Sequence, residues 1–516
     1  MSRGGMSESI LTSPHADSHT VQVDATAVVA GSTPPLDPGP QSLSEAAREL
    51  LQLAFPFILS SSFTTIQVFI DRIFISAVSP DAVAAAMPTI GYFWTPMALF
   101  QFTVLYVTVF VAQYTGAGRP SRVGPVVWQG LYFALIAGLI FPLFIPFVDA
   151  IIGWTDHDPA VKVLESAYFH GLSLSALPML LVAAVSAFFA GRQQSWTVLA
   201  INGLGAAVNA ACAVPLILWN RENPEAAMFG AGLAAAIGST VSAVLGLVLF
   251  FRPKFRAIYG TVSGWRFDGV LFRRLMYYGL PNGAQFCMEG LAFTIFILLI
   301  GNLGRAELAA STLTFSLNLL TFLPVMGLGQ GVEVLVGRRQ GESRPDLSAR
   351  TTHAGALLAT LYMIVLAILY FTVPNVMIAP FKAEMKPEDW AAVGPLIPIL
   401  LRFVAGYSLA DGANIIYAYA LRGAGDTRYV TFLAIVLSWP IMVIPTYFCW
   451  KYGWGLQAAW AFATAYVVIL AIAFWLRFLG GRWRTMRVIE AAIVVDSEVE
   501  SLKVDSLKVE SLKVES

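Results

Sequence analysis

The sequence predicts an all-α polytopic membrane protein with twelve transmembrane helices in two parallel six-helix repeats. Of its 516 residues, 57% are hydrophobic and only 12% are charged, about half the charged fraction of an ordinary soluble domain. Apolar blocks of roughly 20 residues or more recur between short polar loops, and only helices and closed barrels satisfy the backbone in lipid. The short alternating segments of a barrel are not found in this sequence. A pattern from the first half of the chain also returns in the second.

Twelve apolar segments are expected to be the spanning helices. They cover residues 48–78, 83–115, 123–151, 163–190, 195–219, 228–251, 272–302, 306–337, 347–379, 391–421, 428–451 and 456–480. Several exceed the roughly 20 residues that cross a bilayer, so tilted or kinked helices are expected.

These segments divide the chain into five parts. Residues 1–47, rich in Ser, Thr, Pro and Asp and lacking a cleavable signal peptide, are expected to be a disordered cytoplasmic arm. Residues 48–257 are expected to form an N-terminal six-helix lobe, 258–271 a cytoplasmic linker and 272–488 a C-terminal six-helix lobe. Residues 489–516, with their five-residue SLKV repeats, are expected to be a disordered tail.

Basic residues alternate from loop to loop. One set of loops, which includes Arg119, Arg192, Arg256 and Arg338, carries roughly three times as many Lys and Arg residues as the other set. The positive-inside rule therefore predicts a plasma (inner) membrane protein with both termini in the cytoplasm.

The internal repeat has a constant offset. The stretch ISAVSPDAVAAAMPTIGYFW begins at residue 75 and IGNLGRAELAASTLTFSLNL begins at residue 300, which places Gly116 over Gly341 and Pro120 over Pro345. Because order and sidedness agree in both copies, the two halves are predicted to be parallel repeats.

Ionisable side chains inside the spans are candidates for function, because each costs about 2.5–3.5 kcal/mol on insertion scales. The acids are Asp71, Glu289, Glu333 and Asp411, and the bases are Arg72 and Arg402. Glu333 lies only five residues before Arg338, so an interfacial role is expected for it.

Three polar stripes surround three of these acids. With helical spacings of three and four, the stripes consist of Ser60, Thr64, Gln67 and Asp71; Asn282, Gln285 and Glu289; and Ser408, Asp411 and Asn414, with Tyr407 beside them. Such a face is too polar to contact lipid. It therefore lines a water-filled cavity, or it packs on another polar face and holds two helices together.

Other function classes find no support in the sequence. The 32 basic and 32 acidic residues cancel, so no nucleic-acid partner is expected. We find neither a GxxxxGK[ST] phosphate loop nor a hydrolase motif, and therefore expect no enzyme activity. The three cysteines have unrelated spacings, and His170 and His353 lack a second ligand at helical spacing, so we expect no metal site and no cofactor.

Five segments carry a family resemblance. They are FIDRIFISAVSPDAVAAA and VAQYTGAGRP in the first half, and MEGLAFTIFILLIGNLG, GQGVEVLVGRRQGE and ALRGAGDTR in the second. In this order the chain resembles the multidrug and toxic compound extrusion (MATE) transporters over residues 45–485 or so, and is closer to their NorM-like branch. The resemblance implies a V-shaped protein of two lobes that exports organic cations in exchange for sodium ions or protons.

The resemblance also implies site residues. Asp71, Asn209, Glu289 and Asp411 fall on the family's acids and asparagine of the first, fifth, seventh and tenth helices. Two positions depart from the family: Ala213 replaces the second aspartate of the DinF-like branch, and Arg72 replaces a small polar residue beside Asp71.

A mechanism follows from carboxylates in a low-dielectric cavity, which can take up a proton or hold a cation. Oxygens of Asp411, Ser408, Asn414 and Glu289 would suit a sodium ion if the seventh and tenth helices adjoin. Phe286 and Tyr407 are candidates for substrate contact.

The expected partners are a small organic cation and membrane lipids, and the protein is expected to be a monomer. The alternatives are a lipid-linked oligosaccharide flippase of the same superfamily, which predicts a cationic cavity, and a non-transporting membrane scaffold.

Overall fold

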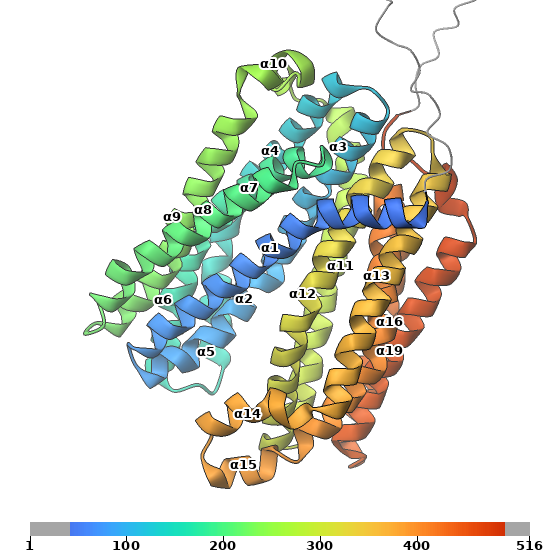
Figure 1. Cartoon of the computed structure of the whole chain (residues 1–516). Coiled ribbons are helices and arrows are strands. Elements are labelled where there is room, and N and C mark those ends of the chain that lie inside the picture. Colours follow the sequence, from blue (N-terminus) through green and yellow to red (C-terminus); the bar gives the residue numbers. More distant parts are fainter. Residues whose placement is uncertain (1–41, 491–516) are drawn as a thin grey trace, which may run out of the picture. The chain divides into compact units, whose positions relative to one another are not determined.

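The computed structural model describes residues 42–490, without the side chains of Thr64 and a few other residues. In that range every regular element is helical (Figure 1). The predicted disordered arm and repeat tail fall mostly on residues 1–41 and 491–516, outside the described part of the chain.

The first half of the chain supplies nine α-helices and three short helical turns. They are α1 (Leu43–Ser76), α2 (Pro80–Leu105), α3 (Val107–Gly116), η1 (Pro120–Arg122), α4 (Val123–Ile140), η2 (Phe141–Phe144), α5 (Ile145–Trp154), α6 (Pro159–Ser173), α7 (Ala176–Gly191), α8 (Ser195–Ala213), η3 (Val214–Leu218) and α9 (Pro224–Phe250).

A short linker leads to the second half. The linker contains α10 (Pro253–Tyr259) and η4 (Ser263–Trp265). The second half consists of α11 (Gly269–Gly301), α12 (Arg305–Gly341), α13 (Pro345–Thr372), α14 (Pro374–Glu384), α15 (Pro387–Val393), α16 (Leu396–Ala424), α17 (Thr427–Ser438), η5 (Trp439–Val443), α18 (Ile444–Lys451), α19 (Gly455–Leu479) and η6 (Arg482–Thr485).

Each predicted span contains one of these helices or a broken pair of them. In the described part of the chain, nine helical segments are long and apolar enough to cross a membrane, or eleven if two bent pairs each count as one span. The pairs are α6 with α7 and the two parts of α12, bent by 40° and 43°. The remaining predicted span is α1, whose 34 residues include the polar stretch around Gln67. It is long enough to cross the bilayer.

Several boundaries differ from the sequence prediction. Helix α1 begins at Leu43, before the predicted start, because Ser42 and Glu45 form a capping box: each side chain accepts a hydrogen bond from the other residue's backbone N–H. Pro374 divides the predicted span 347–379, since proline cannot continue the helix before it. At the other end of the chain, Ile489 is buried although the disordered tail was predicted to begin there.

The two halves form two packed groups of helices. In the first, α9 packs on α6, α7 and α8; in the second, α16 packs on α12, α13 and α19. We call them the N lobe and the C lobe. Helix α1 joins them, because it contacts α8 of its own lobe and also α12 and α13 (Figure 1). Further contacts between lobes are made by α2 with α11 and by α3 with α12.

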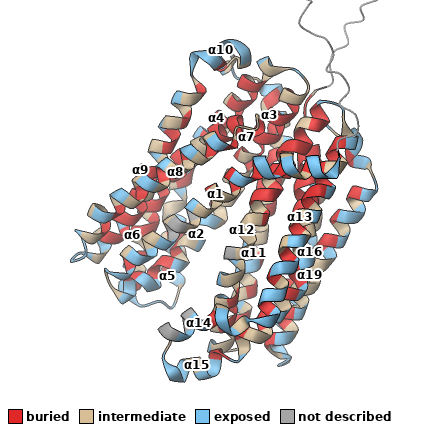
Figure 2. Cartoon of the chain, viewed as in Figure 1, coloured by how far each residue is buried: buried red, intermediate tan, exposed pale blue. Residues whose placement is uncertain are grey.

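The outer surface of both lobes is apolar. Figure 2 shows buried residues along the packed helix faces and exposed residues along the outer ones. Many exposed side chains are large and hydrophobic, including Leu139, Phe147, Ile368 and Phe371. In water such a surface would associate or aggregate, whereas in a bilayer it faces lipid tails.

The lobes come closest at the end of the molecule that carries Arg119, Arg338 and Arg487, which we call the arginine-rich end. Here Gly116 of α3 lies against the backbone carbonyl of Arg338, and Gly341 of α12 lies against that of Gln113. A Cβ atom on either glycine would collide with the facing carbonyl oxygen. Glycine is therefore required for α3 and α12 to pack this closely.

Candidate functional site

A cavity of about 640 Å³ lies between the membrane-spanning helices and belongs mainly to the C lobe. Glu289 of α11 and Asp411 of α16 both line it, together with Tyr407 and Asn414. The sequence placed these acids on separate polar stripes, and the structure places both acids on the wall of one cavity. We call this space the C-lobe cavity.

Amide groups orient the two carboxylates of this cavity. Gln285 Nε2 donates a hydrogen bond of 3.1 Å to Glu289 Oε1, and Asn414 Nδ2 donates one of 3.3 Å to Asp411 Oδ1. The amide oxygens of Gln285 and Asn414 are buried and have no hydrogen-bond partner among residues 42–490. The site therefore presents several oxygen acceptors and few donors, which favours a cation over an anion.

Aromatic rings form the rest of the wall. Phe315 stacks on Trp460 with ring centroids 4.6 Å apart, and Phe293 meets Phe315 edge to face at 4.9 Å. The Trp460 indole donates to Ser311 Oγ at 3.1 Å, which satisfies its polar edge and fixes the ring. A cavity of this size with apolar walls and two acids suits a drug-sized molecule that carries positive charge.

A second cavity, of about 270 Å³, lies in the N lobe and is lined by Gln67, Asp71, Tyr168 and Asn202. Asp71 Oδ1 is buried without a hydrogen-bond partner in the described part of the chain. The adjacent Arg72 does not neutralise it, since its guanidinium donates to the Met87 sulfur at 2.7 Å. Neighbouring residues on a helix point in directions about 100° apart.

Arg72 has a further property: it lines both the N-lobe cavity and the C-lobe cavity. It is one of the two residues that depart from the family pattern, the other being Ala213. Its positive charge therefore stands between the two sets of acids, so any cation that passes from one cavity to the other meets it.

A third cavity, of about 230 Å³, lies between the lobes and is lined by both of them. Phe286 is found here and not in the C-lobe cavity; it stacks on Phe102 of the N lobe at 3.6 Å. Arg422 lies over the Phe286 ring at 4.8 Å. Glu333 also lines this cavity, so its side chain faces the space between the lobes.

Three other predicted residues, Ser408, Gln285 and Asn209, do not line these three cavities. The Ser408 hydroxyl donates to the Ala405 carbonyl of its own helix at 3.0 Å. Asn209 is buried at the contact of α8 with α9, next to Gly238, and neither of its side-chain polar atoms has a partner in the range that the structure describes. Residues 42–490 contain no cluster of three or more His, Cys, Asp or Glu side chains suited to a metal ion.

Some lining residues were missed by sequence reasoning. Asn202 lies seven residues before Asn209, a spacing that places both on one helix face, and this signal was available. The aromatic residues Phe293, Phe315, Trp460 and Tyr466 could not have been found, because aromatic residues in apolar spans usually fill cores.

Known proteins match both halves of the chain, including the helices that line these cavities. The family model MatE matches residues 56–214 and 281–448, which is more than half of the chain and covers both lobes. The chain belongs to the MatE family. MatE proteins are membrane transporters, so this chain is an integral membrane protein and not an enzyme.

Individual relatives agree with this assignment. The chain is 28% identical over 462 residues to a probable multidrug resistance protein NorM of Xanthomonas axonopodis pv. citri, covering 87% of this chain and 97% of that protein. It is 27% identical over 398 residues to a probable NorM of Shewanella oneidensis, covering 77% and 85%. This supports the predicted likeness to the NorM-like branch.

Solved MatE structures share the fold. A crystal structure of a MATE transporter in complex with MaL6 superposes with a TM-score of 0.76 at 18% identity, covering 85% of this chain and 96% of that one. An outward-facing multidrug resistance MATE transporter of the MOP superfamily gives 0.76 at 17% identity, covering 86% and 97%. These likenesses confirm the predicted two-repeat, all-helical architecture.

Proposed function

We propose that this protein exports organic cations across the inner membrane in exchange for sodium ions or protons, with its arginine-rich end in the cytoplasm. One observation carries the proposal: Glu289 and Asp411, from different helices, line one aromatic cavity of about 640 Å³. The relatives named NorM multidrug resistance proteins support a multidrug efflux function for this chain.

Coupling follows from competition for the same negative charge. Carboxylates in a cavity of low dielectric are costly in their charged form, and a proton, a sodium ion or a cationic substrate each relieves this cost. Oxygens of Glu289, Asp411 and Asn414 line the C-lobe cavity and are available to a sodium ion, whereas Ser408, which the sequence also suggested as a ligand, does not line it. Binding of the ion therefore displaces the substrate.

Export requires that the site open to one side at a time. The lobes are in contact at the arginine-rich end. Here the hydroxyl of Tyr106, the residue before α3, donates a hydrogen bond of 2.8 Å to the Arg422 carbonyl. In the proposed cycle the lobes rock about their interface, so that the cavities face first one compartment and then the other.

Proteoliposomes loaded with a fluorescent organic cation test the proposal. We expect export when a sodium gradient or, separately, a pH gradient is imposed across the vesicle, and none without a gradient. The coupling ion is the one whose gradient drives export. Absence of transport under both gradients would contradict the proposal and would favour a scaffold, whereas transport of lipid-linked oligosaccharide would favour a flippase.

A further inference from the structure

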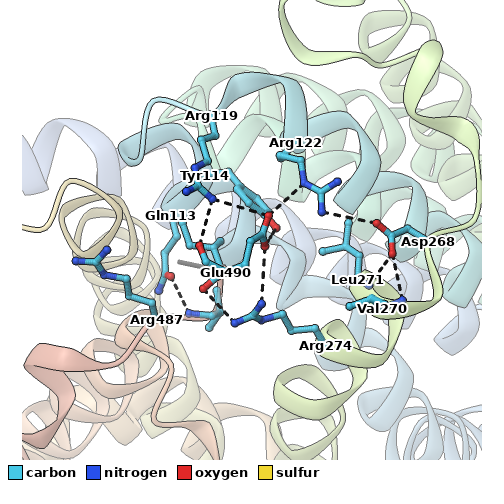
Figure 3. A network of polar contacts seen from close by, with 12 residues as sticks. Gln113, Tyr114, Arg119, Arg122, Asp268, Val270, Leu271, Arg274, Arg487 and Glu490 are labelled. Atoms are coloured by element: carbon cyan, nitrogen blue, oxygen red, sulfur yellow. Dashed lines mark hydrogen bonds and ion pairs between the residues drawn. The ribbon is translucent and has the colours of Figure 1, made fainter. Parts of the chain in front are cut away.

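The last described residues of the chain cross from one lobe to the other. Residues Arg482–Glu490, which follow α19, begin on the C lobe and end against the N lobe (Figure 3). We call them the C-terminal strap. Three sets of contacts hold it: one at its start, one in its middle and one at its end.

The start of the strap is firmly attached to the C lobe. Trp483 is fully buried, its ring stacks on Phe478 with centroids 4.6 Å apart, and its indole donates to the Phe478 carbonyl at 2.7 Å. Gln340 of α12 donates to the Trp483 carbonyl at 2.9 Å. Releasing this end would expose a large aromatic ring, so the strap stays with the C lobe when the lobes separate.

Gln113 of α3 links the middle of the strap to both lobes. Its Oε1 accepts a hydrogen bond of 2.8 Å from the Val488 N–H, and its Nε2 donates one of 3.0 Å to the Gly423 carbonyl of α16. One buried amide therefore satisfies a strap donor and a C-lobe acceptor from a position in the N lobe.

Glu490 makes the second link to the N lobe. The Tyr114 hydroxyl donates to its carboxylate at 2.6 Å, and Arg122 Nε lies 3.3 Å from it (Figure 3). Arg119 donates to the Glu490 backbone carbonyl at 3.2 Å. Arg274 of the C lobe lies 3.8 Å from the same carboxylate and donates to the Ile489 carbonyl at 3.1 Å, so basic residues of both lobes meet on this one acid.

The link at Glu490 is suited to repeated release. Its carboxylate and the arginines around it remain 25–39% exposed, so water can replace the arginines as the contact breaks, whereas Tyr114 is buried. Ion pairs of this exposure are individually weak, in contrast to the buried Trp483. The strap thus has a permanent end and a reversible end.

We propose that the C-terminal strap holds the lobes together at the arginine-rich end and that Glu490 must leave Tyr114 and Arg122 whenever this end opens. Glu490 and Tyr114 are then positioning residues for transport: they touch no substrate and act through the lobe interface. This inference rests on the alternating access of the proposed function.

The distance between the lobes tests the proposal directly. Spin labels at Lys254→Cys on α10 and Asp346→Cys on α13, two exposed positions without strap contacts, report separation of the lobes at this end. The full chain is used after Cys212, Cys287 and Cys449, its three cysteines, have been replaced by alanine. The fraction of molecules with the long, open distance is the measured quantity.

Glu490→Gln should raise the ratio of open to closed molecules by about three- to tenfold, because it removes the charge on which the arginines converge. Tyr114→Phe removes one hydroxyl without a change of shape and should raise the ratio less. Since both act on one contact, the double variant should exceed Glu490→Gln only slightly. The control is Glu388→Gln, which removes the charge of an exposed acid on α15, outside the strap and its contacts.

Unchanged distances in both Glu490→Gln and Tyr114→Phe, or an equal change in Glu388→Gln, would overturn the strap proposal. Export of the organic cation by the same preparations keeps the two proposals apart. If the distances shift but the protein exports nothing under either gradient, the proposed function is contradicted. If the protein exports the cation but the distances do not shift, the strap proposal is contradicted.

Discussion

Gly116 and Gly341 occupy equivalent positions in the two repeats and make reciprocal contacts across the lobe interface. Gly116 lies on the carbonyl of Arg338, and Gly341 lies on the carbonyl of Gln113. The sequence offset that carries residue 75 to residue 300 also carries Gln113 to Arg338 and Gly116 to Gly341. The contact is therefore symmetric, as expected where two parallel repeats meet about a pseudo-two-fold axis.

Gly341→Ala should weaken this contact. The new methyl group would meet the Gln113 carbonyl, and overpacking of this kind costs typically about 1–3 kcal/mol. We expect a higher fraction of lobes that are apart at the arginine-rich end, measured with the spin labels at positions 254 and 346. Gly91→Ala is the control, because a Cβ atom there meets no atom within 4 Å. Equal behaviour of the two variants would argue against close packing as the reason for Gly341.

The two acids of the C-lobe cavity should each be needed for export. Glu289→Gln and Asp411→Asn keep the shape of the side chains and remove the negative charge that a cation needs. A loss of about tenfold or more in export rate is expected, which corresponds to about 1.4 kcal/mol of lost interaction. Export from proteoliposomes measures it. Glu388→Gln, on the exposed surface of α15, should export like the parent protein; full export by both cavity variants would remove these acids from the site.

Arg72 should lower the affinity for cations, since its guanidinium lines the cavity that contains Glu289 and Asp411. Arg72→Gln is expected to reduce the KM for a monovalent organic cation by about two- to tenfold, because a like charge is removed from the site. Initial export rates over a range of substrate concentrations give the KM. The matched change Arg221→Gln, at an exposed loop, should leave it unaltered. A KM that rises in Arg72→Gln would mean that the arginine binds substrate.

Substitution of Phe293 should affect substrate binding, whereas substitution of Trp460 should affect stability. Phe293 lines the C-lobe cavity but remains 43% exposed, so Phe293→Ala should raise the KM with little change in Tm. Trp460 is fully buried, and Trp460→Ala should lower stability by about 3–5 kcal/mol. Thermal unfolding in detergent and export kinetics compare the two. Similar Tm losses in both variants would show that Phe293 is a core residue.

Acid should release the strap. Burial by itself raises the pKa of Glu490, but hydrogen bonds from Tyr114 and the backbone, with the positive charges of Arg122 and Arg274, outweigh it and hold the pKa below the ordinary value of 4.5. A lowered pKa means that the stabilisation is complete above the ordinary value and is lost as the pH falls through the lowered one. The distance between spin labels should therefore be constant between about pH 5 and pH 8 and lengthen below that range.

Glu490→Gln controls this pH experiment. The variant cannot titrate at this position, so its distances should show no strap-dependent change in acid. An acid response as large in Glu490→Gln as in the parent protein would assign it to other carboxylates.

The sequence alone determined the class of the protein, the order of its helical segments and the parallel repeat. The class and the helix order depend on the length of the apolar segments along the chain. The repeat depends on a constant sequence offset, which is still visible in residue pairs such as Gly116 and Gly341. It also identified Asp71, Glu289 and Asp411, because a charge inside an apolar span is conspicuous whatever its partners are.

Only the tertiary structure decided which groups share a cavity. That Glu289 and Asp411 line one cavity while Asp71 lines another depends on how the helices of each lobe pack, and helix packing is a long-range result that local periodicity does not contain. The same holds for Phe286, which lies between the lobes, and for Ser408, whose hydroxyl turns to its own helix. The strap was beyond sequence reasoning for the same reason: Glu490 is an ordinary polar residue until folding places Tyr114 and three arginines around it.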